Sequence, residues 1–173
     1  MLCPAIAFCQ YNVVELDGGP IKRNIFGNFH VNNDSTLRAK VFLLNDQFAG
    51  LVFTTSNFTF GYEDRKNSIS GVITGEVSKE IVALNYQVAV FDVYGDHIIN
   101  LTAGDLKDYA TGVFSDTAKW AVYDDDVLGA LTFLVFVSKV RFRDGTVWRY
   151  DEKNLAAQLN KLRLTELKKD EKK

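Results

Sequence analysis

The pattern of apolar and polar residues is clearest over residues 131–150, LTFLVFVSKVRFRDGTVWRY. Residues 131–137 are almost wholly apolar and rich in Val and Phe, which predicts a strand covered on both faces. From Ser138 onward, apolar and basic residues alternate as far as Asp144-Gly145. This dipeptide is the strongest short-range hairpin signal, because both central residues of a type I′ turn take positive φ. We therefore predict a hairpin whose return strand is 146–150.

A two-residue loop at Asp144-Gly145 would decide which side chains of the hairpin share a face. In that register Arg141 pairs with Trp148 and Lys139 with Tyr150, while apolar residues turn toward the core. The expected core residues are Val140, Phe142 and Val147. The candidate ligand-binding residues lie on the opposite face and are Lys139, Arg141, Arg143, Trp148 and Tyr150.

This cationic and aromatic face has two interpretations. Aromatic rings stack on sugars or bases, and arginines pair with carboxylates or phosphates, so the face is the best candidate for ligand binding. In the other interpretation, the stems of the basic side chains simply cover Trp148, at about 0.2–1 kcal/mol per cross-strand pair. The sequence favours the second, purely structural interpretation.

The rest of the chain reads mostly as strands separated by turns rich in Gly, Asn and Asp. Along 81–94, alternate residues from Val82 to Val90 are large and apolar, which places them on one face. A turn is expected at Asp17-Gly18-Gly19-Pro20 and a single helical turn at 103–109. Strands are predicted at 24–31, 37–44, 48–55, 58–62, 69–77, 81–94, 97–101 and 120–123.

The end of the chain is predicted to be an amphipathic helix over 151–169. Asp151 suits the N-cap, and Glu152 complements the positive end of the helix dipole. Leu155, Leu159 and Leu162 form an apolar stripe at helical spacing.

Together these elements predict a mostly-β fold, an antiparallel Ig-like β-sandwich with a C-terminal amphipathic helix. The sandwich would span 11–150, and the helix and a charged tail 151–173. The alternative is a calycin-type β-barrel that carries a small apolar ligand, since its strand number and C-terminal helix suit this length. Against the barrel, no Gly-x-Trp opens the first strand.

Composition narrows the possible functions. A hydrophobic content of 47% with 13% aromatics excludes disorder for the bulk of the chain. The 20 basic and 22 acidic residues give a net charge of −2, so no overall field attracts nucleic acid or an anionic membrane. No run approaches the roughly 18 apolar residues of a membrane span.

The N-terminus predicts export. Residues 2–9 are apolar, and Ala5-Ile6-Ala7 matches the small-x-small pattern of signal-peptide cleavage. Residues 1–10 are therefore expected to be the remnant of an export signal or a disordered N-terminus, with a first buried strand as the alternative. The expected location is periplasmic or secreted. Cys3 and Cys9 are the only cysteines, so no disulfide framework is predicted.

No constellation of residues predicts catalysis, a cofactor or a metal. The only histidines, His30 and His97, adjoin no nucleophile and are expected at strand ends on the surface. The run 124–126, with Asp116 nearby, offers carboxylates to calcium, but a solvated acidic loop is the favoured interpretation. We predict a non-enzymatic binding or structural module with an unknown protein or glycan partner and no nucleic acid. The sequence does not predict its oligomeric state.

Residues 68–101 resemble the FxLYD domains, small β-sandwich modules of secreted bacterial proteins. Gly75-Glu76-Val77, Phe91-Asp92 and Gly95 occupy the places of their usual pattern, and Ser78-Lys79-Glu80 replaces their Asn-rich link. Residues 140–151 look like the close of many exported bacterial proteins, so the resemblance reaches about Leu162. It implies an extracytoplasmic Ig-like sandwich and carries no catalytic residue.

Overall fold

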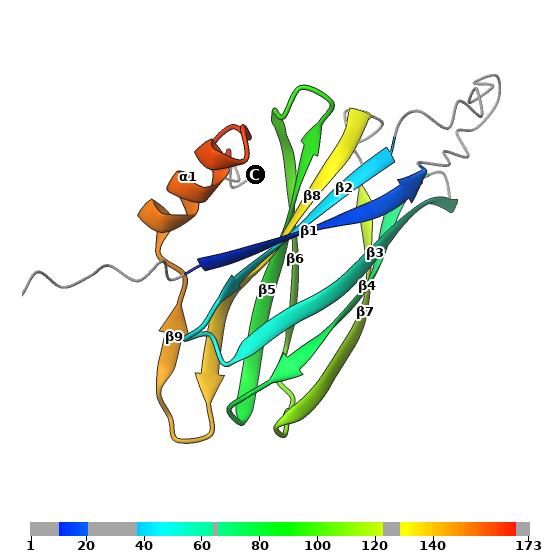
Figure 1. The fold of residues 1–173 in the computed structure, drawn as a ribbon. Coiled ribbons are helices and arrows are strands. Elements are labelled where there is room, and N and C mark those ends of the chain that lie inside the picture. The colour runs from blue at the N-terminus through cyan, green and yellow to red at the C-terminus, as the bar shows by residue number, and fades with distance from the viewer. Residues whose placement is uncertain (1–10, 21–37, 64–65, 123–128, 169–173) are drawn as a thin grey trace, which may run out of the picture.

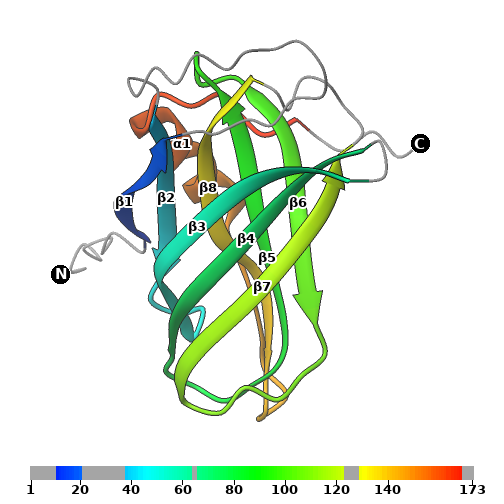
Figure 2. The same cartoon turned by 90° about the vertical axis from the view of Figure 1, so that its right-hand side faces the viewer.

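The computed structural model describes residues 11–20, 38–63, 66–122 and 129–168. Their strands form two sheets packed face to face, and a helix covers the outer face of one sheet (Figures 1 and 2). The strands are β1 Tyr11–Pro20, β2 Arg38–Asp46, β3 Leu51–Glu63, β4 Lys66–Val77, β5 Ile81–Asp92, β6 His97–Asp105, β7 Gly112–Val122, β8 Ala130–Phe142 and β9 Val147–Arg149, and the helix is α1 Glu152–Lys161.

Sheet A contains the strands in the order β1-β2-β8-β5-β6, with β9 also paired to β8, and sheet B the order β3-β4-β7. The predicted mostly-β sandwich with a C-terminal helix is confirmed. The prediction that it is antiparallel is wrong at one pair, because β2 and β8 run parallel. A parallel pair needs a long crossover. Here sheet B and the β5–β6 hairpin supply it.

The main core lies between the sheets. Leu84, Tyr86, Val88 and Val90 of β5 all point into it, which confirms the predicted face for these four residues. Val82 is only half-buried, because the pairing of β5 with β8 shifts between Ile81 and Ala83. Aromatic rings from both sheets fill the space, as where Phe58 stacks on Phe133 with ring centroids 4.5 Å apart. The described strands thus form two sheets around a filled core, and not one closed calycin-type barrel.

A second core lies between sheet A and α1. Leu155 and Leu159 of the helix pack with Leu134 and Phe136, which point outward from β8. Since Phe133, Val135 and Val137 point inward, β8 is buried on both faces over 133–137, which confirms most of the run 131–137 predicted to be covered.

The helix begins as predicted and ends early. Asp151 caps it by accepting hydrogen bonds from the N–H groups of Lys153 and Asn154 at 2.8 and 3.1 Å. It stops at Lys161, and not at 169, because Arg163 takes a positive φ of 59°. The chain then crosses the β5–β6 turn so closely that a Cβ on Gly95 would lie 2.7 Å from the Arg163 carbonyl oxygen.

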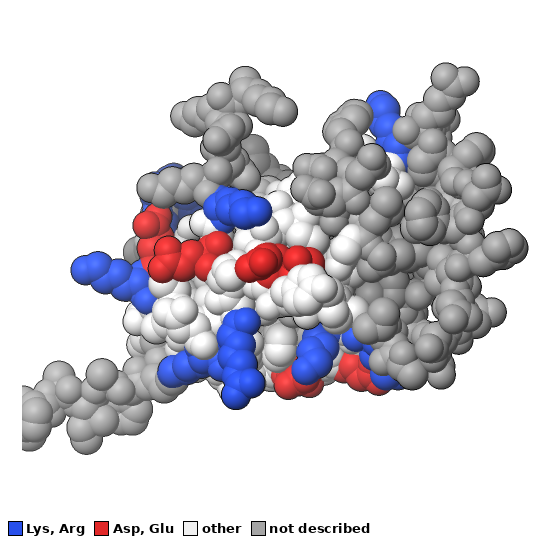
Figure 3. Space-filling model, turned by 90° about the horizontal axis from the view of Figure 1, so that it is seen from above, with Lys and Arg blue, Asp and Glu red and all other residues white. Residues whose placement is uncertain are grey.

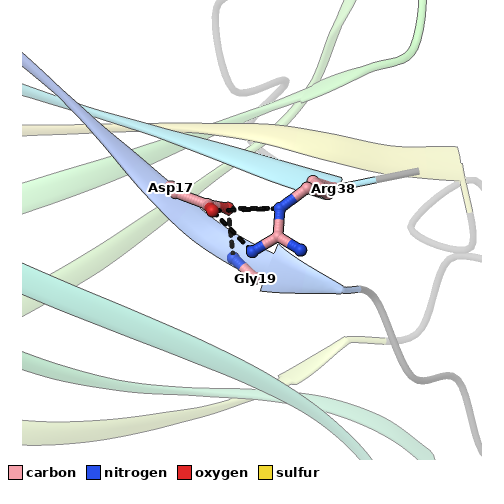
Figure 4. Close-up of polar contacts among 3 residues, drawn as sticks. All are labelled: Asp17, Gly19 and Arg38. Atoms are coloured by element: carbon pink, nitrogen blue, oxygen red, sulfur yellow. Dashed lines mark hydrogen bonds and ion pairs between the residues drawn. The ribbon is translucent and has the colours of Figure 1, made fainter. Parts of the chain in front are cut away.

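Two predicted turns are wrong. Residues 103–109 form no helical turn, because β6 continues to Asp105 and Tyr109 exchanges two backbone hydrogen bonds with Ile81. The run Asp17–Pro20 lies inside β1, where the pairing with β2 becomes irregular. Figure 4 shows how Asp17 stabilises this stretch, by accepting hydrogen bonds from the Gly19 N–H and from the Arg38 guanidinium of β2.

The remaining strand predictions are confirmed with shifted ends. The separate strands at 48–55 and 58–62 are one strand, β3, and β7 begins at Gly112 instead of 120. Polar residues interrupt the apolar pattern without ending the strand: exposed Thr54, Thr55 and Asn57 in β3, and exposed Ser115 and Thr117 in β7. The predicted strand 24–31, the acidic run 124–126, the segment 1–10 and His30 lie outside the described residues.

Candidate functional site

The β8–β9 hairpin closes with a three-residue loop in place of the predicted two-residue one. Phe142 donates its N–H to the Thr146 carbonyl at 2.9 Å, and Gly145 donates to the Phe142 carbonyl at 3.0 Å. Gly145 has a φ of 86°, as a type I turn followed by a glycine bulge requires. Asp144 completes the turn by accepting from the Thr146 N–H at 2.9 Å.

This loop shifts β9 by one residue against the predicted register. Arg141 lies opposite Val147, Val140 opposite Trp148, and Lys139 opposite Arg149. A shift by one residue exchanges the two faces of a strand. The predicted face assignment is therefore wrong for β9: Trp148 joins the inter-sheet core beside Val140, and Val147 is 45% exposed on the outer face.

The structure thus separates the predicted site residues. Lys139 and Arg141 stay together on the outer face of sheet A. Arg143 lies in the loop, where it forms ion pairs with Glu80 at 2.6 Å and with Asp108 at 3.2 Å. Trp148 packs against the core between the sheets. Tyr150 lies near α1, edge-on to Phe136 with ring centroids 5.4 Å apart.

The shift brings in a basic residue that sequence reasoning did not assign to the face, Arg149. Lys139 lies between Arg149 of β9 and Asn85 of β5, and Arg141 lies two residues further along β8 on the same face. An extra residue, Ser138, explains why these basic side chains point outward. The pairing with β5 skips Ser138, so Val137 and Val140 both face the core.

These residues line an open hollow of about 660 Å³ on the outer face of sheet A. We call it the cationic concavity and define it by Ala83, Asn85, Leu106, Lys139, Arg141, Val147 and Arg149. It lies at the β9 end of the sheet, which is below α1 in Figure 1. Gly104, opposite Asn85 on β6, leaves room for this amide, because a Cβ there would meet its Oδ1 at 2.2 Å.

The basic side chains of the concavity differ from several other basic residues of the molecule. Arg38 pairs with Asp17, Lys40 with Glu15, and Lys79 with Asp144. Figure 3 shows both signs of charge side by side at another end of the molecule. In the part of the chain that the structure describes, no acidic side chain forms an ion pair with the concavity's basic residues, Lys139, Arg141 and Arg149.

The ion pairs of the neighbouring loop have clear electrostatic consequences. The Asp108 carboxylate, and then Glu80, raise the pKa of the Arg143 guanidinium. Lys79, and then Thr146, hold the pKa of Asp144 well below its usual range. The charged side chains of the loop are therefore compensated by neighbouring charges of opposite sign. The basic side chains of the outer face have no such compensation among the described residues.

A second hollow, of about 470 Å³, lies under α1 on the same face of sheet A. Gln87, Tyr150, Glu152 and Leu155 are among its lining residues, and the segment 166–168 forms a wall. Burial, and then the charge of Glu152, raise the pKa of the Tyr150 hydroxyl.

His97 holds that wall in place, and the prediction of a surface position is wrong because the C-terminal segment covers it. The residue is only 2% exposed. Its Nδ1 accepts the Lys168 N–H at 3.2 Å, which leaves Nε2 to donate to the Asn100 Oδ1 at 3.0 Å.

The described residues offer no other obvious chemistry. No group of three or more His, Cys, Asp or Glu side chains among them is placed to hold a metal ion. None of their helices has the length and hydropathy of a membrane span. Buried Tyr86 donates to Asp116 at 2.6 Å, and burial followed by this hydrogen bond raises the tyrosine pKa. Such a hydroxyl is a structural donor, not a base.

Comparisons with protein-family models, with curated proteins and with solved structures found no match for this chain. The function must therefore be argued from the geometry of the molecule.

Proposed function

We propose that the protein is a non-catalytic, exported binding module of Ig-like type, whose cationic concavity binds an anionic group of a protein or glycan partner. The observation that supports the proposal is the set of Lys139, Arg141 and Arg149. These three side chains share one concave face, and no acidic partner pairs with them among the described residues.

Placing these basic side chains close together destabilises the protein in the absence of a ligand. Like charges directly opposite each other on a strand pair are destabilising, and Lys139 and Arg149 are such a pair. Two unit charges a few ångströms apart in water repel by roughly 1 kcal/mol. A bound anion would turn this repulsion into attraction through charge-assisted hydrogen bonds.

The alternative, a carrier that encloses an apolar ligand, has less support. Its ligand would occupy the interior, and large side chains such as Phe53 and Tyr86 fill the space between the sheets. The open face of sheet A, in contrast, carries a hollow of about 660 Å³.

The binding proposal can be tested by NMR of the backbone amides during titration with acetate, sulfate and phosphate at constant ionic strength. We expect at least one anion to shift the signals of 83–85, 139–141 and 147–149, and the double variant Lys139→Ser, Arg149→Ser to lose these shifts. Arg143→Ala is the matched control, because it removes a basic residue of the same hairpin that already has acidic partners. If none of the three anions shifts these signals, the proposal is wrong.

The export proposal rests on the apolar segment 2–9 and its Ala-x-Ala pattern. It is tested by fractionating the source cells and detecting the protein with an antibody. Recovery from the periplasmic or secreted fraction is expected, and recovery with cytoplasmic proteins would contradict it.

A further inference from the structure

We propose that the ligand group of the cationic concavity is the phosphate of an organic phosphate monoester. This inference rests on the proposed function and names the chemistry that its site recognises. It depends on three features of the concavity: how its basic residues are arranged, how many charges and donors they present, and which apolar residues lie beside them.

The three basic residues form a compact triangle. Lys139 and Arg149 are directly opposite each other on β8 and β9, and Arg141 is two residues from Lys139 on the same face. Adjacent strands lie about 4.8 Å apart, and diagonal neighbours on one face about 7–8 Å apart. Three long side chains rooted this closely can converge on one small group from three directions.

A phosphate monoester matches this triangle better than a carboxylate does. It carries about −1.5 to −2 charges at neutral pH and has three strong acceptor oxygens. Arginine's planar fork suits phosphate oxygens, and lysine adds a point charge. A carboxylate offers one charge and two oxygens, which would leave part of the triangle uncompensated.

The surroundings of the triangle suit the organic part of such a ligand. Asn85 adds an amide beside Lys139, and Ala83 and Val147 flank Arg141 on the same face. Leu106, which is 89% exposed, forms an apolar wall of the concavity. A volume of about 660 Å³ lies within the usual range of roughly 300–1,000 Å³ for small-ligand sites.

The triangle is a site for one phosphate and not a track for a polymer of phosphates. Lys79 and Arg143, the basic residues of the neighbouring loop region, are occupied by acidic groups. The chain's net charge of −2 also gives no overall attraction to a nucleic acid. The phosphate therefore belongs to a small molecule or to a lipid headgroup such as phosphatidate.

The test is isothermal titration of the full chain with butyl phosphate and with butyrate. At about pH 8, where the phosphate is a dianion, we expect butyl phosphate to bind at least about tenfold more tightly than butyrate. Affinity should fall as the pH is lowered through about 6, because the ligand takes up its second proton there.

Two variants decide whether the triangle is responsible. Arg141→Lys keeps the charge and loses the fork, so butyl phosphate should bind about threefold or more weakly. Arg143→Ala should bind as the wild type does. A melting curve of each variant checks folding, and if Arg141→Lys does not fold, Arg149→Lys replaces it and the same loss is expected.

The outcomes separate the two proposals. If butyrate binds as tightly as butyl phosphate, the phosphate inference is overturned while anion binding stands. If neither ligand nor any anion of the NMR titration binds, both proposals are overturned.

Vesicles of phosphatidylcholine with and without phosphatidate show whether the phosphate belongs to a lipid or to a soluble molecule. Co-sedimentation with phosphatidate vesicles that Arg141→Lys weakens supports a lipid headgroup, and butyl phosphate binding without co-sedimentation supports a soluble monoester.

Discussion

The two faces of the β8–β9 hairpin have opposite characters. On the inner face, Val140 and Phe142 are buried, and Trp148 packs against the core between the two sheets. On the outer face, Lys139, Arg141 and Arg149 are exposed, and no described acidic residue pairs with them. Neighbouring residues of one strand thus serve different purposes. The inner face explains why the hairpin folds, and the outer face has no such explanation within the protein.

This difference predicts that substitutions on the inner face change stability and those on the outer face change binding. The largest effect is expected for Phe142→Ala. Its ring is buried, packs close to Gly50 and lies under the Lys79 ammonium, 4.1 Å from the ring centroid. Loss of transfer free energy plus a cavity should lower the free energy of unfolding by about 3–5 kcal/mol, as measured by urea denaturation. A loss below about 1 kcal/mol would contradict the assignment of this face.

The turn that joins the two strands should rank second. Gly145 has a φ of 86°, and nothing lies within 4 Å of the place where a Cβ would be. Gly145→Val therefore costs backbone strain without a clash, which we expect to be about 1–3 kcal/mol in urea denaturation. A variant as stable as the wild type would show that the loop does not require the left-handed conformation.

The acid stability of the loop gives a smaller effect. Lys79, and then Thr146, lower the pKa of Asp144 well below the usual value of an aspartate, so its carboxylate is favoured in the folded state. The stability it contributes is complete above the unfolded pKa and is lost as the pH falls below about 4. Unfolding measured from pH 6 down to pH 2 should show a shallower acid-induced loss in Lys79→Ala. An unchanged profile would mean that the pair contributes nothing.

The smallest effect on stability is expected for the outer face. Lys139→Ser and Arg149→Ser, separately or together, should change the free energy of unfolding by no more than about 0.5 kcal/mol. The double variant should be less stable than the sum of the two single effects predicts, because either single change already removes the repulsion of the pair. A loss above about 1 kcal/mol from either single variant would mean that the residue supports the fold.

The sequence predicted the structure correctly where the local pattern of residues determines which side chains are buried. The doubly buried run 133–137, the alternating face of β5 from Leu84 to Val90 and the Asp151 cap all follow from periodicity and capping chemistry, and the structure confirms them. These features depend on residues close together in the chain. They are therefore visible without knowledge of the tertiary structure.

The candidate site was only partly predictable, because its register depends on distant contacts. Asp144-Gly145 suits a two-residue and a three-residue loop equally well. The three-residue loop places the Arg143 N–H on the Glu80 carbonyl at 3.1 Å and Asp144 beside Lys79. Neither partner is near the hairpin in sequence, so Arg149 was missed, Trp148 was assigned to the wrong face, and Tyr150 lies beside α1 instead of among the basic residues.

The same limit explains the early end of α1 and the burial of His97. Both follow from the path of 163–168 across the β5–β6 turn, where the Thr165 N–H donates to the Gly95 carbonyl at 2.9 Å. The apolar pattern of a helix continues past this point in the sequence. The helix itself ends because the chain contacts the distant Gly95.

The central claim is that the outer-face triangle exists for a ligand and not for the fold. The most direct measurement is the free energy of unfolding against butyl phosphate concentration, at constant ionic strength, for the wild type and for the triple variant Lys139→Ser, Arg141→Ser, Arg149→Ser. We predict that the wild type gains stability by linkage, about 2.7 kcal/mol at one hundred times the dissociation constant. The triple variant should gain nothing, while being at least as stable as the wild type without ligand. Equal gains in both proteins, or a triple variant that is clearly less stable without ligand, would contradict the claim.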